Sequence, residues 1–151
     1  MTTCPMRDQI PYLVAAANRQ FDALVLPIVR PEGLTIETWR ILGLLAEQPG
    51  QAMTSLADRV LVEAATLTKI IDRMVSDILV CRARDPKDRR RVLIYPTPRG
   101  VALHQRLAPL AAARLAHIDR CLGPSQAAAL RSALERLRQG ESEWLPRSMA
   151  L

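Results

Sequence analysis

The sequence predicts a mainly α-helical protein with one small β-hairpin. Aromatic residues make up only 3% of the 151 residues although hydrophobic residues make up 49%, so aliphatic side chains must fill the core, as suits packed helices. Apolar residues also recur at helical spacing along most of the chain. The exception is a pair of short strand-like runs on either side of Asp85-Pro86, a good turn starter, and this pair predicts the hairpin.

The N-terminal part of the chain is expected to form two helices. The first runs from about residue 9 or 10 to about residue 28, and Pro27 and Pro31 are expected to end it because proline disrupts a helix interior. The second covers residues 36–47. Thr35 stands just before it and can cap its N-terminus through the side-chain oxygen.

Two short amphipathic helices follow, separated by a turn. Each has an apolar stripe at helical spacing: Leu56, Ala57 and Val60 in the first, and Leu67, Ile70, Ile71 and Met74 in the second. Leu61-Val62-Glu63 leaves room for the turn, which is typical of a helix-turn-helix. Small and hydroxyl residues at the start of the second helix allow close approach to base edges, and Lys69 and Arg73 can reach guanine acceptors or phosphates. An ordinary helical hairpin with a polar outer face is the alternative.

The β-hairpin is strongly basic. Six basic residues against two acidic ones, Asp85 and Asp88, leave it at +4: Arg82, Arg84, Lys87, Arg89, Arg90 and Arg91. A narrow hairpin tipped with arginine fits the minor groove of DNA, where the potential is most negative. A solvated surface hairpin is the alternative for a charge run alone, but a helix pair followed directly by a basic hairpin is a much more specific pattern.

The C-terminal third is expected to form a long helix and a shorter one. Thr97 can cap the long helix, Gly123-Pro124 breaks it, and the last helix covers residues 125–138. The apolar faces of these helices and of the first helix are longer than a small DNA-binding module needs. In a monomer they would form more core. In a dimer they would join two protomers and present two recognition helices to successive major grooves of a palindrome.

Several motifs carry a family resemblance. Leu56-Ala57 opens the first motif helix, and the recognition helix from Thr66 to Met74 contains Asp72-Arg73. The hairpin has Asp85, Asp88 and Arg90 at characteristic spacing, and Thr97-Pro98-Arg99-Gly100 follows its second strand. On these motifs the chain resembles the MarR family of winged helix-turn-helix transcriptional regulators, roughly from Leu34 to Leu137.

The resemblance implies a fold, a partner and a set of DNA contacts. The expected regions are an N-terminal dimerisation helix (1–34), a winged helix-turn-helix domain (35–100) and C-terminal dimerisation helices (101–151). Double-stranded DNA is the expected partner of a homodimer whose interface includes Leu110, Leu130, Leu134 and Leu137. The wing Arg90 would enter the minor groove and Asp88 would orient it. The full set of expected DNA-binding residues is Thr54, Ser55, Ala64, Ala65, Thr66, Thr68, Lys69, Arg73, Arg84, Lys87, Asp88, Arg89 and Arg90.

The chain departs from the family pattern at two positions near the DNA-binding surface. Glu63 stands where the family usually has Ser or a similar capping residue; a carboxylate favours the helix dipole but repels phosphate. Ile78 stands where the family often has Gly before the first wing strand. Because a β-branched residue is strained at positive φ, we expect that turn to be built differently.

Regulation by a small molecule is a further expectation from the resemblance. Family members often bind aromatic acids or other phenolic compounds between the dimerisation helices and the winged module, and thioesters of such acids are related candidates. Tyr12, Trp39 and Arg40 are the candidate pocket residues: Trp39 offers a flat apolar wall and Arg40 can pair with a carboxylate. The alternative is that Trp39 packs in the core and Arg40 faces solvent or a DNA phosphate.

The cysteines and histidines give weaker support to redox sensing and to metal binding than the motifs above give to regulation by a small molecule. Cys4, Cys81 and Cys121 are odd in number and scattered, so they do not suggest a disulfide framework. A redox-sensing regulator is nevertheless an alternative, since some relatives sense peroxides through a cysteine. His104 and His117 lie thirteen residues apart on one expected helix and cannot chelate one ion within a chain without other ligands. We expect neither a metal nor a cofactor.

Charge and motif content narrow the remaining classes of protein. A net charge of +6 and a pI near 10.0 suggest an acidic polymer as partner. No apolar run reaches membrane-spanning length and the N-terminus lacks a signal-peptide layout, so we expect a cytoplasmic protein without membrane association. Phosphate loops, zinc-protease motifs and nucleophile elbows are absent, so we expect no enzyme. A nonspecific architectural DNA-binding protein is the third alternative.

Overall fold

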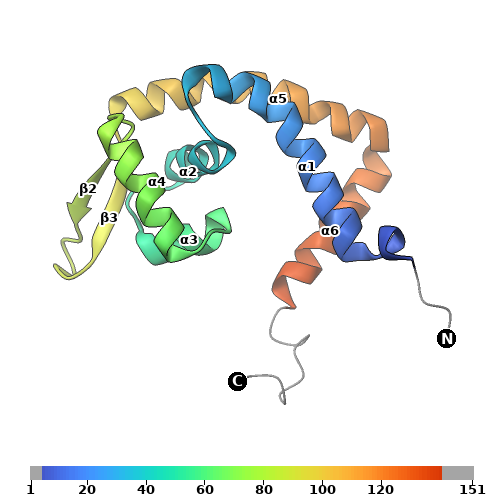
Figure 1. Ribbon diagram of the computed structural model, residues 1–151, viewed down its shortest axis with the longest axis horizontal. Helices are drawn as coiled ribbons and strands as arrows, with labels where there is room; N and C mark the ends of the chain where they lie inside the picture. The colour runs from blue at the N-terminus through green and yellow to red at the C-terminus, as the bar shows by residue number, and fades with distance from the viewer. Residues whose placement is uncertain (1–4, 141–151) are drawn as a thin grey trace, which may run out of the picture. The chain divides into compact units, whose positions relative to one another are not determined.

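The computed structural model describes residues 5–140 and divides the chain into two compact units. The first unit is Met1–Ala112 and the second is Ala113–Leu151, so the boundary falls inside the long helix α5 (Pro98–Leu122). Figure 1 shows the elements in chain order. Besides the start of α5, the first unit contains η1 (Met6–Asp8), α1 (Ile10–Val29), η2 (Arg30–Glu32), α2 (Ile36–Glu47), β1 (Gln51–Ala52), α3 (Met53–Val60), α4 (Ala64–Ser76), β2 (Val80–Arg84) and β3 (Val92–Pro96).

The first two helices follow the sequence signals with one correction. Helix α2 has the predicted limits because Thr35 and Thr38 form a reciprocal cap. The Thr38 N–H donates to Thr35 Oγ1 at 3.2 Å and the Thr35 N–H donates to Thr38 Oγ1 at 2.7 Å. The prediction that Pro27 helps to end the first helix was wrong, because α1 continues through it to Val29. Pro27 removes one backbone donor only two residues before the helix end, and its fixed φ is compatible with a helix.

Helices α3 and α4 form the predicted helix-turn-helix. Their apolar stripes meet in the core, where five side chains are fully buried: Leu56, Val60, Leu67, Ile71 and Met74. Leu61 adopts the left-handed conformation (φ 65°) after α3, and the Val62 N–H then bonds to the Ala57 carbonyl at 3.2 Å. The turn at residues 61–63 is therefore confirmed, and it reverses the chain without a glycine.

A small antiparallel sheet supports the predicted hairpin. Its strand order is β1-β3-β2, with Cys81 opposite Tyr95 in the hairpin and Gln51 opposite Ile94 on the other edge. Ile94 is fully buried and joins the central strand to the helical core. The hairpin extends beside α4 (Figure 1), and β2 contacts that helix. These contacts place the recognition helix and the wing in one unit.

The turn before the wing corrects a second expectation. Ile78 does adopt positive φ (57°), so the expectation that its β-branched side chain forces a different turn was wrong. Its N–H bonds to the Val75 carbonyl at 3.0 Å, and its carbonyl accepts a 2.6 Å hydrogen bond from Thr97 Oγ1. The side chain is 61% exposed. Hydrogen bonds at both ends of the residue therefore hold a backbone conformation that glycine would adopt more easily.

The start of α5 is tied closely to the same turn. Thr97 Oγ1 accepts a hydrogen bond from the Gly100 N–H at 3.1 Å, which confirms the predicted cap. A Cβ on Gly100 would lie 2.1 Å from the Leu79 carbonyl oxygen. Only glycine permits this approach, so α5 packs directly on the backbone that leads into the wing.

The second unit contains the last turns of α5 and helix α6 (Pro124–Gln139), separated at Gly123 (φ 78°) as predicted. Asp119 and Arg131 form an ion pair across that break. Ala127 is the one buried residue between positions 113 and 140. Across the described part of the chain, no helix is both long and apolar enough to span a membrane.

Candidate nucleic-acid interface

The outer face of α4 is a row of small, hydroxyl and basic side chains. The predicted contact residues Ala64, Ala65, Thr66, Thr68, Lys69 and Arg73 are all exposed. Alanines and a threonine in the first turn keep this end of the helix slim enough to approach base edges. Thr68 Oγ1 donates to the Ala64 carbonyl at 3.0 Å, so its hydroxyl is held along the helix.

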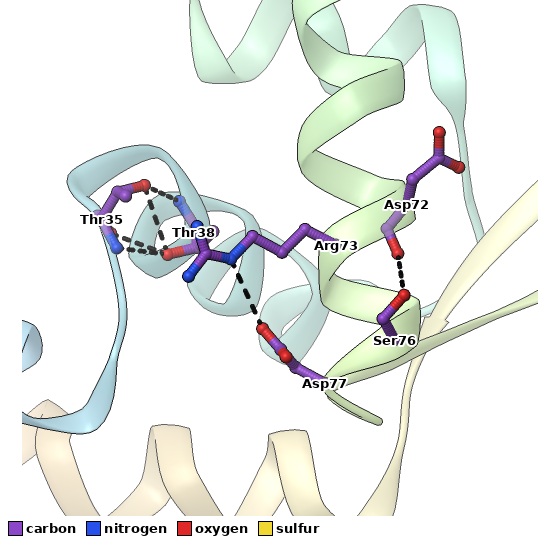
Figure 2. A network of polar contacts seen from close by, with 6 residues as sticks. All are labelled: Thr35, Thr38, Asp72, Arg73, Ser76 and Asp77. Atoms are coloured by element: carbon purple, nitrogen blue, oxygen red, sulfur yellow. Dashed lines mark hydrogen bonds and ion pairs between the residues drawn. The ribbon is translucent and has the colours of Figure 1, made fainter.

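The two basic residues of this face differ in their surroundings. Lys69 has no ion-pair partner among residues 5–140, so its ammonium group is available to a phosphate or a guanine. Arg73 Nε lies 3.8 Å from Asp77 Oδ2, and both side chains are well exposed. Figure 2 shows the Arg73 side chain extending toward Thr35 and Thr38 at the start of α2, while Asp72 points in another direction. Such an exposed pair is weak, and Arg73 can exchange it for another anion.

An ion pair joins the recognition helix to the wing. Arg82 Nη2 on β2 donates to Asp72 Oδ1 on α4 at 2.6 Å. Sequence reasoning assigned Asp72 only to a motif and counted Arg82 among the free charges of the hairpin. No spacing rule connects two exposed residues ten positions apart across a turn, so opposite charge was the only available signal. The contact joins the middle of β2 to α4.

The wing tip is shaped by its two aspartates. Asp85 Oδ1 accepts the Lys87 N–H at 2.8 Å and Asp88 Oδ1 accepts the Arg90 N–H at 3.0 Å. Asp88 therefore holds the backbone at Arg90, while no ion pair among the described residues joins its carboxylate to the Arg90 guanidinium. The tip is closed by a bond from the Arg91 N–H to the Asp88 carbonyl at 2.9 Å. No ion pair within the described residues engages the exposed side chains of Arg84, Lys87, Arg89, Arg90 and Arg91.

Residues at the starts of α3 and α4 complete the surface. Thr54 and Ser55 are exposed in the first turn of α3, where hydroxyl groups suit phosphate oxygens. Glu63 occupies the cap position of α4 but makes no side-chain capping hydrogen bond. Its carboxylate favours the helix dipole and opposes the approach of a phosphate to that end of the helix.

Sequence reasoning missed a buried anchor beneath this surface. The Gln51 side chain is buried and donates to the carbonyl oxygens of Leu44 and Gln48 at 2.8 and 2.9 Å. Its oxygen accepts a 2.7 Å hydrogen bond from Arg59 Nη1 on α3. Gln51 thereby satisfies the last carbonyls of α2 and positions α3 against them. A polar residue in a two-residue strand gave no periodic signal from which this role could be predicted.

The candidate ligand residues lie in two places. Trp39 is partly buried against the core and stacks on His104, with ring centroids 5.0 Å apart. Burial lowers the pKa of His104 below its ordinary value of 6.5. Arg40 Nη2 pairs with Asp22 Oδ1 at 3.0 Å and contacts Asn18 Oδ1 at 3.4 Å. Tyr12 is half exposed on α1 and lines a separate hollow of about 300 Å³.

The cysteines of the described region are exposed. Cys81 lies on β2, and Cys121 Sγ lies 3.3 Å from His117 Nε2 on α5. Cys4 lies outside the described residues. Nowhere between residues 5 and 140 do three potential metal-ligating side chains gather.

The four predicted interface leucines are apolar side chains left in contact with solvent. Leu110 on α5 is 54% exposed, and the α6 residues Leu130, Leu134 and Leu137 are 41%, 39% and 37% exposed. Positions 130, 134 and 137 recur at helical spacing and therefore share one face of α6.

Comparison of the sequence with known families and proteins agrees with this geometry. The model of the MarR family matches residues 34–92. The homoprotocatechuate degradative operon repressor of Escherichia coli is 35% identical over 101 residues, which make up 67% of this chain and 68% of that protein. The regulator FarR of Neisseria gonorrhoeae is 30% identical over 115 residues, or 76% of this chain and 79% of that protein.

Solved structures resemble the whole described fold. The transcriptional repressor CouR, bound to a 23-mer DNA duplex, superposes with a TM-score of 0.79 at 25% identity and covers 91% of this chain and 98% of its own. NadR in complex with 4-hydroxyphenylacetate superposes with a TM-score of 0.79 at 27% identity and covers 91% and 97%. One of these proteins is thus seen with DNA and the other with a phenolic acid.

Proposed function

Because the chain belongs to the MarR family, and is a DNA-binding transcriptional repressor of that type rather than an enzyme, we propose that it binds a pseudo-palindromic operator as a homodimer and is released by a small aromatic or phenolic ligand. In this mechanism the exposed face of α4 enters the major groove and Arg90 enters the minor groove. The bound ligand changes the spacing of the two wings and so weakens the complex.

One observation carries the DNA-binding part of this proposal. The basic face of α4 and the wing-tip arginines, which have no ion-pair partner among residues 5–140, belong to one unit, and the Asp72–Arg82 contact at 2.6 Å joins α4 to β2 of the wing. A helix and a cationic hairpin held in fixed relation can read adjacent major and minor grooves together. The charges of Lys69, Arg84, Lys87, Arg89 and Arg90 supply the phosphate attraction that binding requires.

The homodimer is supported by the exposed leucines. Exposed apolar surface lies C-terminal to the proposed DNA-binding residues, at Leu110, Leu130, Leu134 and Leu137. Pairing these surfaces between two copies would remove them from water. A twofold dimer would also place two recognition helices on half-sites about one helical turn apart, so the operator would be a palindrome.

Release by a ligand is supported by the site around α2 and by the relatives. NadR is seen with 4-hydroxyphenylacetate, and the Escherichia coli relative represses a homoprotocatechuate degradative operon. In this chain Trp39 offers an aromatic wall, and Arg40 is held by Asp22 at 3.0 Å. A ligand carboxylate would exchange with Asp22 for Arg40, whereas Tyr12 lines a separate hollow on α1. An aromatic acid is the proposed effector class. A thioester of such an acid is the related candidate, but it lacks the carboxylate that would pair with Arg40 and would use only the Trp39 wall.

A gel-shift titration tests this function. The DNA upstream of the protein's own gene is titrated in excess nonspecific competitor, and Arg90→Ala is compared with wild type and with Arg120→Ala, an exposed arginine far from the wing in sequence. Wild type and Arg120→Ala should give a competitor-resistant complex that dissolves with an aromatic acid, and Arg90→Ala should lose it without unfolding. A complex abolished by competitor would favour the architectural alternative; unchanged affinity of Arg90→Ala would refute the wing assignment.

Redox control is a second candidate with one observation behind it. The Cys121 side chain is exposed, so a peroxide can reach it, and its Sγ lies 3.3 Å from His117 Nε2. A 26% identical protein of Bacillus subtilis is an organic hydroperoxide resistance regulator. If peroxide releases the DNA and Cys121→Ser prevents release while Cys81→Ser does not, redox control through Cys121 is supported. Release that persists in Cys121→Ser removes this candidate.

A further inference from the structure

Two side chains that commonly ligate metals lie together near the end of α5, within the second unit. His117 and Cys121 are both exposed, and His117 Nε2 lies 3.3 Å from Cys121 Sγ. Residues four positions apart share one face of a helix, and the same spacing places the two histidines of a zinc-protease helix on one ion. Sequence reasoning compared His117 only with His104 and therefore missed this pair.

The distance between the two donor atoms fits a single ion held by both. Zinc lies about 2.3 Å from a thiolate sulfur and about 2.0 Å from an imidazole nitrogen, so a tetrahedral ion separates these donors by about 3.6 Å, and a linear ion separates them by more than about 4 Å. The observed 3.3 Å therefore requires an angle at the ion only slightly narrower than tetrahedral. This geometry favours a four-coordinate ion such as Zn²⁺ over a linear, two-coordinate one.

The chain supplies two of the four ligands that such an ion takes. Asp119 is the one carboxylate among residues 113–122, and it is engaged in an ion pair with Arg131. No third potential ligand gathers beside the pair in the part of the chain that the structure describes. Because both donors are exposed, water can fill the other two positions. An ion at this site would therefore be exchangeable rather than structural.

We propose that His117 and Cys121 bind a zinc-like divalent cation, and that the bound ion shields the Cys121 thiolate from oxidants. The ligands would be the neutral imidazole and the deprotonated thiol. Arg114 and Arg120 stand near the pair on the same helix and repel a cation, so the negative charge of the thiolate is essential to binding. This inference goes beyond the proposed function and depends neither on operator binding nor on the aromatic effector.

A hydrogen bond from the Cys121 thiol to His117 is the alternative explanation of the 3.3 Å contact. The two explanations differ in what a metal ion does. A hydrogen bond needs no ion and leaves the reactivity of the thiol insensitive to Zn²⁺. A coordination site gives a thiolate–metal absorption band and slows the reactions of the thiol.

The first experiment compares two full-length chains with one cysteine each. Cys4→Ser with Cys81→Ser retains Cys121, and Cys4→Ser with Cys121→Ser retains Cys81, which is exposed on β2 and serves as the matched control. Each reduced protein is titrated with Co²⁺, because thiolate coordination to this ion produces a charge-transfer band in the near ultraviolet. The chain that retains Cys121 should give the band and lose it when Zn²⁺ is added. The chain that retains Cys81 should give none.

The second experiment measures shielding in the same two chains. Each reacts with an aromatic disulfide that releases a coloured thiolate, with and without Zn²⁺. The rate at Cys121 should fall about tenfold or more at saturating Zn²⁺, because the ion occupies the thiolate that attacks the reagent. The rate at Cys81 should not change.

A ligand variant shows whether the imidazole takes part. Outer-shell groups contribute about 10–100-fold to metal affinity, so loss of a direct ligand in His117→Gln should weaken Co²⁺ binding at least about tenfold. Arg120→Gln, which keeps both ligands and removes a nearby positive charge, should bind Co²⁺ at least as tightly as its parent. Both variants are made in the chain that retains Cys121, and circular dichroism checks that they fold.

Three outcomes would overturn the metal site: no charge-transfer band in the chain that retains Cys121, an equal band in the chain that retains Cys81, or unchanged Co²⁺ affinity in His117→Gln. Binding of Zn²⁺ that leaves the rate at Cys121 unchanged would overturn the shielding. Since no measurement uses DNA, each result is independent of whether the proposed operator binding holds.

Discussion

The winged helix-turn-helix and the C-terminal unit differ in how deeply they bury their apolar side chains. In the first, α2, α3, α4 and the sheet bury whole side chains, and Ile41, Leu45, Leu56, Leu67, Ile71, Met74 and Ile94 are each essentially inaccessible to water. In the second, between residues 113 and 140, only Ala127 is buried while Leu130, Leu134 and Leu137 remain exposed.

This difference in burial implies a difference in what stabilises each region. Tertiary packing of an apolar face supplies most of the stability of a protein helix. The winged module has that packing within one chain, whereas the α6 leucines keep 37–41% of their surface exposed. The winged module thus holds a packed core within one chain, whereas the exposed leucines of α6 are free to contact another surface, which we propose is a second copy of the chain.

Polar substitution of the α6 leucines should have the largest effect on DNA binding. Leu130→Ser, Leu134→Ser and Leu137→Ser combined should produce a monomer by light scattering, and operator affinity should fall about 10²–10⁴-fold because the two half-sites are no longer bound together. Ala128→Ser and Ala129→Ser, at exposed α6 positions, are the matched control and should remain dimeric. If the leucine variant stays dimeric, the assigned interface is wrong.

A core truncation in the winged module should act on stability instead. Leu56 is fully buried, and Leu56→Ala should reduce the free energy of unfolding by about 3 kcal/mol through lost burial and a residual cavity. Leu61→Ala is the matched control, because Leu61 is 82% exposed in the neighbouring turn and its truncation creates no cavity. Urea unfolding measures both. Equal losses in the two variants would contradict the contrast in packing between core and surface.

Relief of strain before the wing should make the module more stable. Ile78 has φ 57° and an exposed side chain. Ile78→Gly should therefore raise the free energy of unfolding by about 1 kcal/mol. An L-residue in the left-handed conformation costs roughly 1–2 kcal/mol, and glycine removes that strain, but its greater flexibility in the unfolded state offsets part of the stabilisation. Ile78→Ala, which keeps the Cβ, should give a smaller gain. Destabilisation of Ile78→Gly in urea would show that the isoleucine side chain makes a contribution beyond its backbone conformation.

Local signals decided which parts of the fold could be predicted. Thr35 and Thr97 cap the helices they precede, and the apolar stripes of α3 and α4 match the buried positions. These features could be predicted because each depends on residues within one or two helical turns of one another. Ile78 and Pro27 were misjudged because their cost is outweighed by surrounding contacts and by the nearby end of a helix.

The contacts of the site were harder to predict than its elements. Exposure of the α4 face and of the wing arginines follows from the hydrophobic pattern, and these residues lie where the sequence placed them. The pairing of Arg40 with Asp22, and of Arg82 with Asp72, joins different elements through flexible side chains. Several opposite charges were available to each arginine, so three-dimensional packing alone selected the partner.

The smallest expected effect is on stability, and it tests whether the Asp72–Arg82 pair holds the wing in place against α4. Asp72→Asn should cost less than about 1 kcal/mol of unfolding free energy because the Asp72–Arg82 pair is well exposed. Operator affinity should nevertheless fall several-fold, since the wing is no longer held at one angle to α4. A double-mutant cycle with Arg82→Gln measures the coupling. Additive losses in affinity would mean that the two residues act on DNA independently and that the ion pair does not position the wing.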